Sequence, residues 1–542
     1  MVARRRATPL FALVAFIGSA GCGAAPAASA DPEPVVADGY TLEQVHAGGP
    51  LRAPNGLALH PDGTILVASL AADSITRFDP ATGKASPAVP APESESDDVA
   101  IGDDGTIYWT NPPRGTVGSQ SPDGTVRTIT DGIPWVNSIA FDRAGERLFV
   151  GQTFREDGLW EIDPRGEKPD RLVASDLGQP NAFDFGPDGQ IYAPLGKTGQ
   201  VARIDPETGE KTVVVEGLQQ PVSVRFDSSD QLYVLDSIGG ALLQVDISAG
   251  STRTVVELPI ASDNMVIADD DRAYVANMAD SAITEVNLAD GTLRVLTSSP
   301  LAFPVDMARP SADSGEIFIA DSVAVRAIAP ESGELREVAR RHASKIEFPS
   351  AISANAEHLV LVSEMIGSVQ VTDHDVKPVR RFEGFVDPAD AVELDDGSVV
   401  VAEPGLGRLV RADGDAIRPL AEGIGTPVGL ASDGDGRILV ADASGGRVLV
   451  VDPVSGGVTT VAEGLGTPRA VTVDAGGQVV VLDTEGGRVL RLDTEPAVLV
   501  EGLSVGQLDQ PHPRSGGIGV DSDGSIYVTG DRESAIFRLL AD

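Results

Sequence analysis

The sequence predicts an all-β protein built as two tandem six-bladed β-propellers, with twelve four-stranded blades after an N-terminal signal segment. The main observation is a repeated phrase of apolar strand, turn and β-branched strand, which recurs about every 42 residues from Pro54 to Ser515, the period of propeller blades. In addition, the 542 residues include 60 Gly and 38 Pro, which suits a fold with many tight turns.

Each repeat carries signals for four short antiparallel strands. The copy that begins at Pro54, PNGLALHPDGTILVAS, places Asp62-Gly63 between two apolar segments, and Asp-Gly suits a tight hairpin because Gly tolerates positive φ. A third, alternating segment follows, then an Asp-Pro-x-Thr/Ser-Gly turn such as residues 452–456, then a fourth segment. One such sheet cannot bury both of its faces, and radial stacking around an axis solves this problem.

Twelve blades exceed the four to eight of common propellers. A division into six and six is therefore predicted, with residues 40–303 forming the first ring and residues 304–542 the second; seven plus five is the alternative. The segment from Tyr40 to His46 precedes the first complete repeat. We expect it to supply a closing strand to one ring, and the sequence leaves open which one.

Residues 1–22 have the form of an export signal. Three arginines at 4–6 precede a short apolar stretch, and Gly-Ser-Ala-Gly leads into Cys22, the only cysteine. The small residues before Cys22 resemble a bacterial lipobox, which implies acylation of that cysteine; plain secretion after cleavage is the alternative. Residues 23–39 are predicted to form a flexible tether. We expect an exported protein, at the bacterial cell envelope or outside the cell, that meets the membrane only through a lipid anchor.

The charge balance is strongly acidic, with 81 Asp plus Glu against 41 Lys plus Arg. A field of that sign repels phosphate backbones, so a nucleic-acid partner is not expected. An acidic surface also keeps an exported protein soluble.

Several repeats resemble known propeller families. PNGLALHPDG, DDVAIGDDGTIYWTN and VNSIAFDRAGERLFVGQT resemble blades of the senescence-marker-protein/gluconolactonase family. Later repeats such as ILVADASGGRVLVVDP resemble NHL repeats and streptogramin-lyase-type propellers. The resemblance extends over about residues 40–542 and implies the propeller fold, whereas such blades serve many functions.

The residue after the start of each blade should lie near the central channel at one end. In the first ring these positions are polar, except for Val222, and the candidate metal or ligand residues are Asn55, Asp97, Asn137, Asn181 and Asn264. Convergent Asn and Asp oxygens suit Ca²⁺ or another divalent cation. The family resemblance implies a metal that polarises a lactone carbonyl and activates water. The Glu that the family carries in its first blade is absent here, since Arg52-Ala53-Pro54-Asn55 occupies that place.

Other patterns favour structural roles. A polar residue follows the second strand of many blades, and we interpret it as a tie between strands through side-chain to backbone hydrogen bonds; the series comprises Asn111, Asp236, Asn277, Asp321, Glu364, Glu403, Asp442 and Asp483. Asp-x-Asp-Gly at 433–436 and 521–524 falls where hairpin turns are required. The six histidines lack zinc-ligand spacing. Trp135 is either a ligand platform near the mouth of the first ring or a packing residue.

Two functions follow as expectations. The first is a binding or interaction scaffold at the cell envelope, with a protein or a small molecule as its partner. The alternative is a divalent-metal-dependent lactonase-type hydrolase that uses the channel mouth of the first ring.

Overall fold

The computed structural model describes residues 33–69, 74–90, 96–310, 315–474, 476–493, 495–506 and 516–542. These residues form β-strands and loops, with one 3-10 turn at Pro404–Leu406. No helix among them is long and apolar enough to cross a membrane. Cys22, the signal segment and most of the predicted tether lie outside the described residues.

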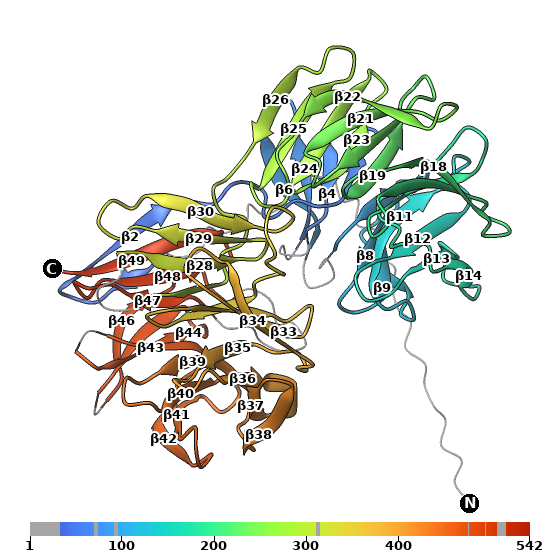
Figure 1. Ribbon diagram of the computed structural model, residues 1–542. Helices are drawn as coiled ribbons and strands as arrows, with labels where there is room; N and C mark the ends of the chain where they lie inside the picture. Colours follow the sequence, from blue (N-terminus) through green and yellow to red (C-terminus); the bar gives the residue numbers. More distant parts are fainter. Residues whose placement is uncertain are drawn as a thin grey trace, which may run out of the picture. The chain divides into compact units, whose positions relative to one another are not determined.

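Six consecutive four-stranded sheets form the first ring (Figure 1). The strands, blade by blade, are β3 (Leu57–Leu59), β4 (Ile65–Val67), β5 (Ser74–Asp79) and β6 (Lys84–Pro90); β7 (Val99–Ile101), β8 (Ile107–Asn111), β9 (Thr116–Gln120) and β10 (Val126–Thr130); β11 (Val136–Phe141), β12 (Leu148–Gln152), β13 (Gly158–Ile162) and β14 (Arg171–Ser175); β15 (Asp184–Phe185), β16 (Ile191–Leu195), β17 (Gln200–Ile204) and β18 (Lys211–Glu216); β19 (Pro221–Phe226), β20 (Leu232–Asp236), β21 (Ala241–Asp246) and β22 (Ser251–Glu257); β23 (Ser262–Ile267), β24 (Arg272–Asn277), β25 (Ala282–Asn287) and β26 (Leu293–Thr297).

Six further sheets form the second ring. Their strands are β27 (Asp306–Ala308), β28 (Ile317–Asp321), β29 (Ala324–Ile328) and β30 (Leu335–Arg340); β31 (Ala351–Ala354), β32 (Leu359–Ser363), β33 (Ser368–Thr372) and β34 (Pro378–Glu383); β35 (Asp390–Glu393), β36 (Val399–Glu403), β37 (Arg408–Asp413) and β38 (Ala416–Glu422); β39 (Pro427–Ser432), β40 (Ile438–Asp442), β41 (Arg447–Val451) and β42 (Val458–Glu463); β43 (Pro468–Val473), β44 (Val479–Asp483), β45 (Arg488–Leu492), β46 (Ala497–Glu501) and β1 (Val35–Val36); β47 (Ile518–Val520), β48 (Ile526–Gly530), β49 (Ala535–Ala541) and β2 (Tyr40–His46).

Each blade runs from a buried inner strand to an exposed outer edge. The second strands are almost fully buried, as β8, β12 and β20 illustrate, whereas the fourth strands, such as β22, are mostly exposed. Neighbouring sheets pack on both faces of the inner strands, so the sequences of these strands are nearly continuous runs of apolar residues.

The innermost strands close two separate circles. In the first ring, β23 of the last blade contacts β3 of the first. In the second ring, β47 of the last blade contacts β27. This arrangement is the six-plus-six division, and two tandem six-bladed propellers are confirmed.

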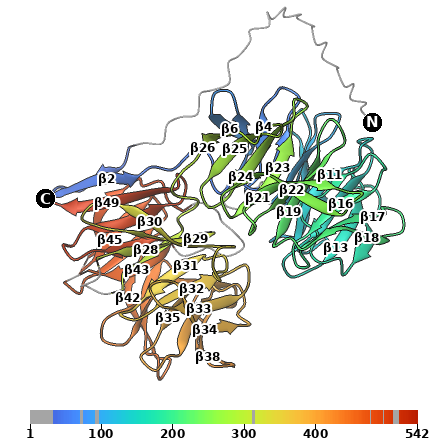
Figure 2. The ribbon, with the colours of Figure 1, turned by 45° about the horizontal axis from the view of Figure 1, so that its top comes forward.

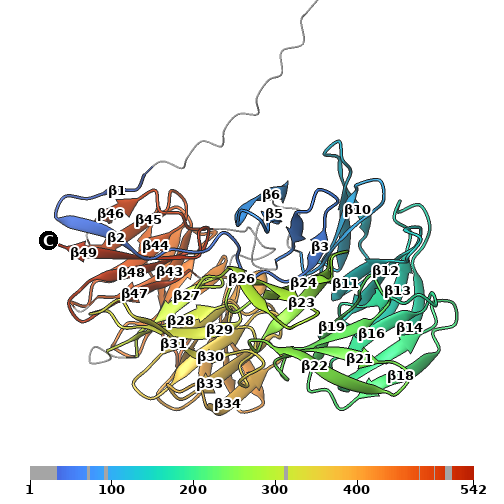
Figure 3. The same cartoon turned by 90° about the horizontal axis from the view of Figure 1, so that it is seen from above.

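The second ring closes with a strand from the beginning of the chain. β2 pairs antiparallel with β49, from Tyr40 opposite Ala541 to His46 opposite Ile536, and Figure 2 and Figure 3 show the blue strand beside the red one. This pairing answers the question that the sequence left open. It also corrects the predicted range 40–303 for the first ring, because the strand at its start belongs to the second. Within the predicted tether, Val35 and Val36 pair with β46, so that part is not flexible chain.

Buried aspartates join neighbouring blades by a common hydrogen-bond pattern. Asp390 illustrates it: one carboxylate oxygen accepts the N–H of Ala391, and the other accepts the N–H of Leu430 on the next inner strand, both at 2.7 Å. The same pattern occurs at Asp98, Asp184 and Asp306. Each carboxylate satisfies two buried donors, so these aspartates fix the register between adjacent sheets.

Candidate functional site

A hollow of about 160 Å³ lies at one end of the first ring's channel. Every blade of that ring contributes to it through a residue near the start of its inner strand. The contributing residues include Asn55, Asp97, Asn137, Asn181, Val222 and Asp263. Four of the five predicted site residues therefore line one pocket.

Asp97 is the centre of the polar contacts in this pocket. The amide nitrogen of Asn55 donates a 2.9 Å hydrogen bond to one of its carboxylate oxygens, and the amide nitrogen of Asn137 donates to the other. All three side chains are at least 95% buried. The two asparagines thus present hydrogen-bond donors to Asp97, and both oxygens of this carboxylate are engaged.

The other two predicted residues behave differently. Asn181 lines the pocket, and its side-chain oxygen accepts the N–H of Ala182 at 2.9 Å. Asn264 does not line it: its oxygen accepts the N–H of Met265, and its amide nitrogen donates to Asp98 at 3.2 Å. The residue before it, Asp263, faces the pocket instead. Asn264 therefore does not join the other four predicted residues at this hollow, because alternate residues of an extended strand point to opposite sides.

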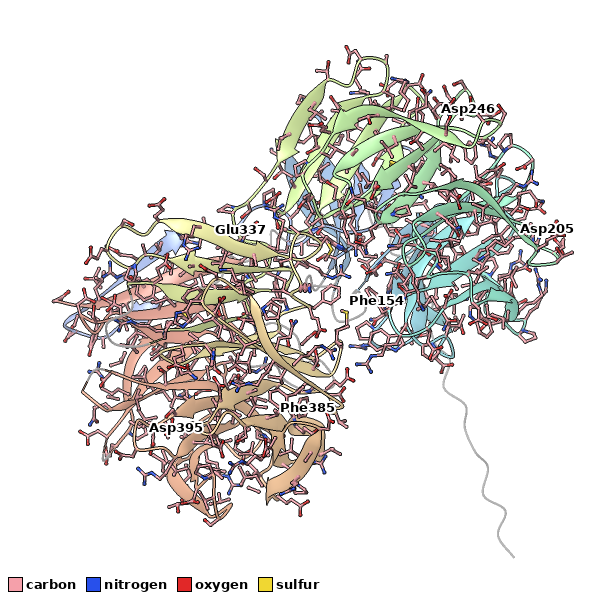
Figure 4. The ribbon with its side chains drawn as sticks, in the orientation of Figure 1. Phe154, Asp205, Asp246, Glu337, Phe385 and Asp395 are labelled. Carbon is pink, nitrogen blue, oxygen red and sulfur yellow. The ribbon has the colours of Figure 1, made fainter. Side chains whose placement is uncertain are left out.

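Part of the pocket wall comes from the second ring. Arg341, His342 and Phe348 lie on the segment between β30 and β31, and all three line the hollow. The Arg341 guanidinium stacks 4.0 Å from the centroid of the Phe348 ring and donates to His342 Nε2 at 2.6 Å. Glu337, labelled in Figure 4, marks the strand that leads into this segment. Sequence reasoning missed these residues, because the blade repeat carries no signal for a loop that serves the other ring.

Burial and opposing charges shift the ionisation of these groups. Burial, and then the nearby Asp263 and Asp98, raise the pKa of Asp97 well above its usual range, although Arg341 and Asn55 oppose the shift. Burial also raises the pKa of Asp263, against the pull of Arg341. Burial lowers the pKa of Arg341 to about 10 despite the attraction of both carboxylates. Asp263 and Arg341 retain part of their solvent-accessible surface, so they belong to the pocket wall and not to the apolar core.

Three buried polar atoms of the pocket have no hydrogen-bond partner within the described protein. They are Asn137 Oδ1, Thr153 Oγ1 and Gln220 Oε1. Buried polar groups in native proteins are almost always paired with protein, water or ligand. Two of the three are pure acceptors and the third is a hydroxyl. Together they make this wall of the pocket rich in acceptors.

An aromatic row borders the pocket. Phe154, labelled in Figure 4, lines it and makes edge contacts with Phe348 at 5.8 Å and with Trp135 at 6.2 Å between ring centroids. Trp135 does not line the pocket, and the Arg155 guanidinium covers its ring at 4.9 Å. The packing interpretation of Trp135 therefore describes its observed contacts, and Phe154 is the aromatic residue at the mouth.

The polar series after the second strands has the expected structural role. The carboxylate of Asp442, for example, accepts the N–H groups of Thr426 and Gly445 and pairs with Arg447. The two Asp-x-Asp-Gly segments form hairpin turns, in which Asp433 accepts the N–H groups of Asp435 and Arg437. Across the described ranges, no group of three or more His, Cys, Asp or Glu side chains has an arrangement that could hold a metal ion.

A larger hollow of about 890 Å³ occupies the channel of the second ring. Many of its acidic side chains are committed to structural contacts. Glu393 is the clearest case, since it accepts from Asn355 at 2.7 Å, contacts His358 Nδ1 at 2.8 Å and pairs with Arg380. Asp306 and Asp390 hold neighbouring blades together, as described above. This hollow therefore offers fewer unengaged polar groups than its composition suggests.

No protein-family model and no curated protein matches the chain. A structure described as that of a gluconolactonase has a TM-score of 0.36 and 12% identity, covering 49% of this chain and 93% of its own. The extracellular domain of a hybrid two-component system from B. thetaiotaomicron has a TM-score of 0.33 and 13% identity, covering 90% and 76%. The tricorn protease has a TM-score of 0.31 and 15% identity, covering 79% and 46%. With eleven four-stranded sheets and one five-stranded sheet closed into two rings, the described part of the chain has the fold of a double β-propeller.

Proposed function

We propose that this chain is an exported, non-enzymatic binding protein whose first ring takes a small polar molecule at its channel mouth. The observation that carries the proposal is a set of buried oxygens, those of Asn137, Thr153 and Gln220, which have no partner among the described residues and belong to residues that line one pocket. A binding pocket needs a few converging polar groups on a rigid frame, and six blades supply both here.

The alternative is the metal-dependent lactonase. A divalent cation would need the oxygens of Asp97 and of the neighbouring asparagines. In this structure the amide nitrogens of Asn55 and Asn137 point to Asp97, and Arg341 already brings a positive charge toward it. This donor set does not fit a divalent cation, so we place binding ahead of hydrolysis.

The test of binding uses the full chain and a panel of small polar compounds. A ligand that binds only the folded state raises its stability by about 2.7 kcal/mol at a hundredfold excess over Kd, which a thermal shift assay detects. Thr153→Val should weaken any ligand found in this way, because it removes a pocket hydroxyl at nearly constant volume. Ser237→Ala is the matched control, since Ser237 Oγ is also buried and partnerless but does not line the pocket.

The hydrolase is tested separately. Metal content after purification and turnover of simple lactones are measured for the wild type and for Asn181→Ala. We expect no stoichiometric divalent metal and no turnover. Bound metal together with turnover that Asn181→Ala abolishes would establish the alternative and refute a purely binding role.

We further propose that Cys22 carries a lipid and holds the protein at the cell envelope. The support is the signal-like segment that ends at this single cysteine. Mass spectrometry of the N-terminal peptide and fractionation of Cys22→Ser test this proposal. An unmodified cysteine and unchanged fractionation would leave secretion without an anchor.

A further inference from the structure

The pocket of the first ring carries opposite charges on different walls. Asp97 and Asp263 come from the first ring, and Arg341 comes from the second. Among the described residues, no carboxylate lies within 4.0 Å of the Arg341 guanidinium, although both aspartates attract it over a longer distance. The charges therefore face a common space without forming an ion pair across it.

Two other arginines of the same blade pair with carboxylates. Arg340, the preceding residue, pairs with Asp280 at 2.8 Å and with Glu337 at 2.6 Å. Arg326 pairs with Asp321 inside the second ring. Withdrawing a guanidinium from water without an anionic partner is costly. Among the residues that the structure describes, the close partners of the Arg341 guanidinium are the Phe348 ring and His342, which leaves guanidinium donors for an oxyanion. Two parallel bonds to a carboxylate are the geometry that guanidinium groups favour.

The remaining polar groups of the pocket are acceptors and a carboxylate, which suit a positively charged donor. Asn137 Oδ1, Thr153 Oγ1 and Gln220 Oε1 have no donor within the described protein, and Asp263 adds a carboxylate. An ammonium group has three donors and no acceptor, so it complements such a set. A neutral polyol would satisfy the acceptors but would leave Arg341 without an anion.

We infer that the ligand of this pocket is a small zwitterion, with its ammonium group toward Asp263 and the partnerless oxygens and its carboxylate toward Arg341. The inference rests on the proposed binding function and specifies its ligand. The small volume of about 160 Å³ favours a molecule of amino-acid size over a peptide or an oligosaccharide. Because Arg341 belongs to the second ring, the bound zwitterion contacts both propellers.

Isothermal titration of the full chain tests this inference. The probes are the common α-amino acids and γ-aminobutyrate as zwitterions, alanine amide without a carboxylate, propionate without an ammonium group, glycerol as a neutral polyol, and calcium chloride. We expect at least one zwitterion to bind. Analogues of that zwitterion that lack either charged group should bind at least about tenfold more weakly, since each loses a charge-assisted contact.

Variants assign the two ends of the ligand. Arg341→Gln and Asp263→Asn should each weaken the zwitterion about tenfold or more, and Arg341→Lys should restore part of the loss because it keeps the charge. Arg340→Gln is the matched control and should change Kd by less than about twofold, since its partners lie outside the pocket. Circular dichroism shows whether each variant is folded. If Arg341→Gln does not fold, Arg341→Lys and Asp263→Asn still test the site.

The possible outcomes distinguish a failure of the zwitterion inference from a failure of the proposed binding function. Binding of glycerol or calcium but of no zwitterion would overturn the ligand class and keep the binding function. Zwitterion binding that neither Arg341→Gln nor Asp263→Asn weakens would overturn the assigned orientation and site. Failure of all these probes, together with failure of the wider panel above, would overturn both proposals.

Discussion

Removal of the buried arginine of the second ring should destabilise the protein far more than removal of a surface lysine. The side chain of Arg326 is 5% exposed and lies 2.5 Å from the carboxylate of Asp321, which is 0% exposed. Arg326 also donates to the backbone oxygen of Ala279. Arg326→Leu keeps much of the side-chain volume but leaves Asp321 as a buried carboxylate without its cation.

The size of the effect follows from what remains around the carboxylate. Breaking a buried ion pair by removing one partner costs about 3–5 kcal/mol. Asp321 keeps two backbone donors, the N–H groups of Ala302 and Phe303 at 3.0 and 2.6 Å, which moderates the loss. We therefore expect the free energy of unfolding to fall by about 3 kcal/mol, the lower end of that range. The Lys377–Asp375 pair, with side chains 73% and 75% exposed, should contribute about 1 kcal/mol or less.

Urea unfolding followed by far-ultraviolet circular dichroism measures the free energy of unfolding of Arg326→Leu and of a variant that lacks the Lys377 side chain. The three tryptophans, Trp109, Trp135 and Trp160, all lie in the first ring, so their fluorescence reports separately on that ring if the two propellers unfold in separate transitions. A double-mutant cycle with Asp321→Asn isolates the pair interaction. A loss below about 1 kcal/mol for Arg326→Leu would show that the pair behaves like a surface ion pair and would refute the reasoning.

Three further predictions concern closure, ionisation and turn geometry. Deletion of residues 1–46 removes β1 and β2, so amide hydrogen exchange in β47–β49, the blade that β2 completes, should accelerate while the tryptophan-reported transition of the first ring stays unchanged. Equal protection of β47–β49 in both forms would contradict this closure. Burial raises the pKa of Asp390 to about 8, so the folded state retains a proton that the unfolded chain releases above about pH 4. Stability should then fall as pH rises from about 4 to 8, by at most about 1.4 kcal/mol per pH unit, and Asp390→Asn should flatten this slope in thermal unfolding; an unchanged slope would argue against it. Gly487→Ala would place a Cβ 2.2 Å from the backbone oxygen of Leu503 at φ +59°, so it should cost more in urea unfolding than Gly63→Ala, where φ is +85° and no atom lies within 4 Å; equal costs would show that the loop relaxes.

Most of the fold could be predicted because a blade is a local structure. The turn at Asp62-Gly63 and its counterparts join strands that are neighbours in sequence, so the residues of one repeat suffice to predict its strands and turns. The role of the polar series after the second strands was also predictable, because Asp442 and its equivalents bind backbone groups within their own blade. The pattern Asp-Pro-x-Thr/Ser-Gly likewise marks a turn wherever it occurs.

The candidate site was predictable only in part. The position of Asn55, Asp97, Asn137 and Asn181 at one channel mouth follows from the repeat. The repeat could not decide between Asp263 and Asn264, because a shift of one residue in a strand reverses the direction of the side chain. It also could not show that the amide nitrogens of Asn55 and Asn137 turn toward Asp97, which depends on three blades at once.

The sequence by itself determined the number of blades, their strand order and the polar character of the first ring's mouth, since these depend on periodicity and on turns within about 42 residues. Only the tertiary structure decided which ring the strand Tyr40–His46 closes and which cation faces Asp97. The closure of the second ring by Tyr40–His46 depends on pairing between segments about 500 residues apart. The hydrogen bond that the Thr41 hydroxyl donates to Asp542, across 501 positions, is an example. The choice of cation depends on Arg341, which reaches the first ring's pocket from the second ring. Contacts of this kind arise from the packing of one closed ring against another chain segment, and no local pattern encodes them.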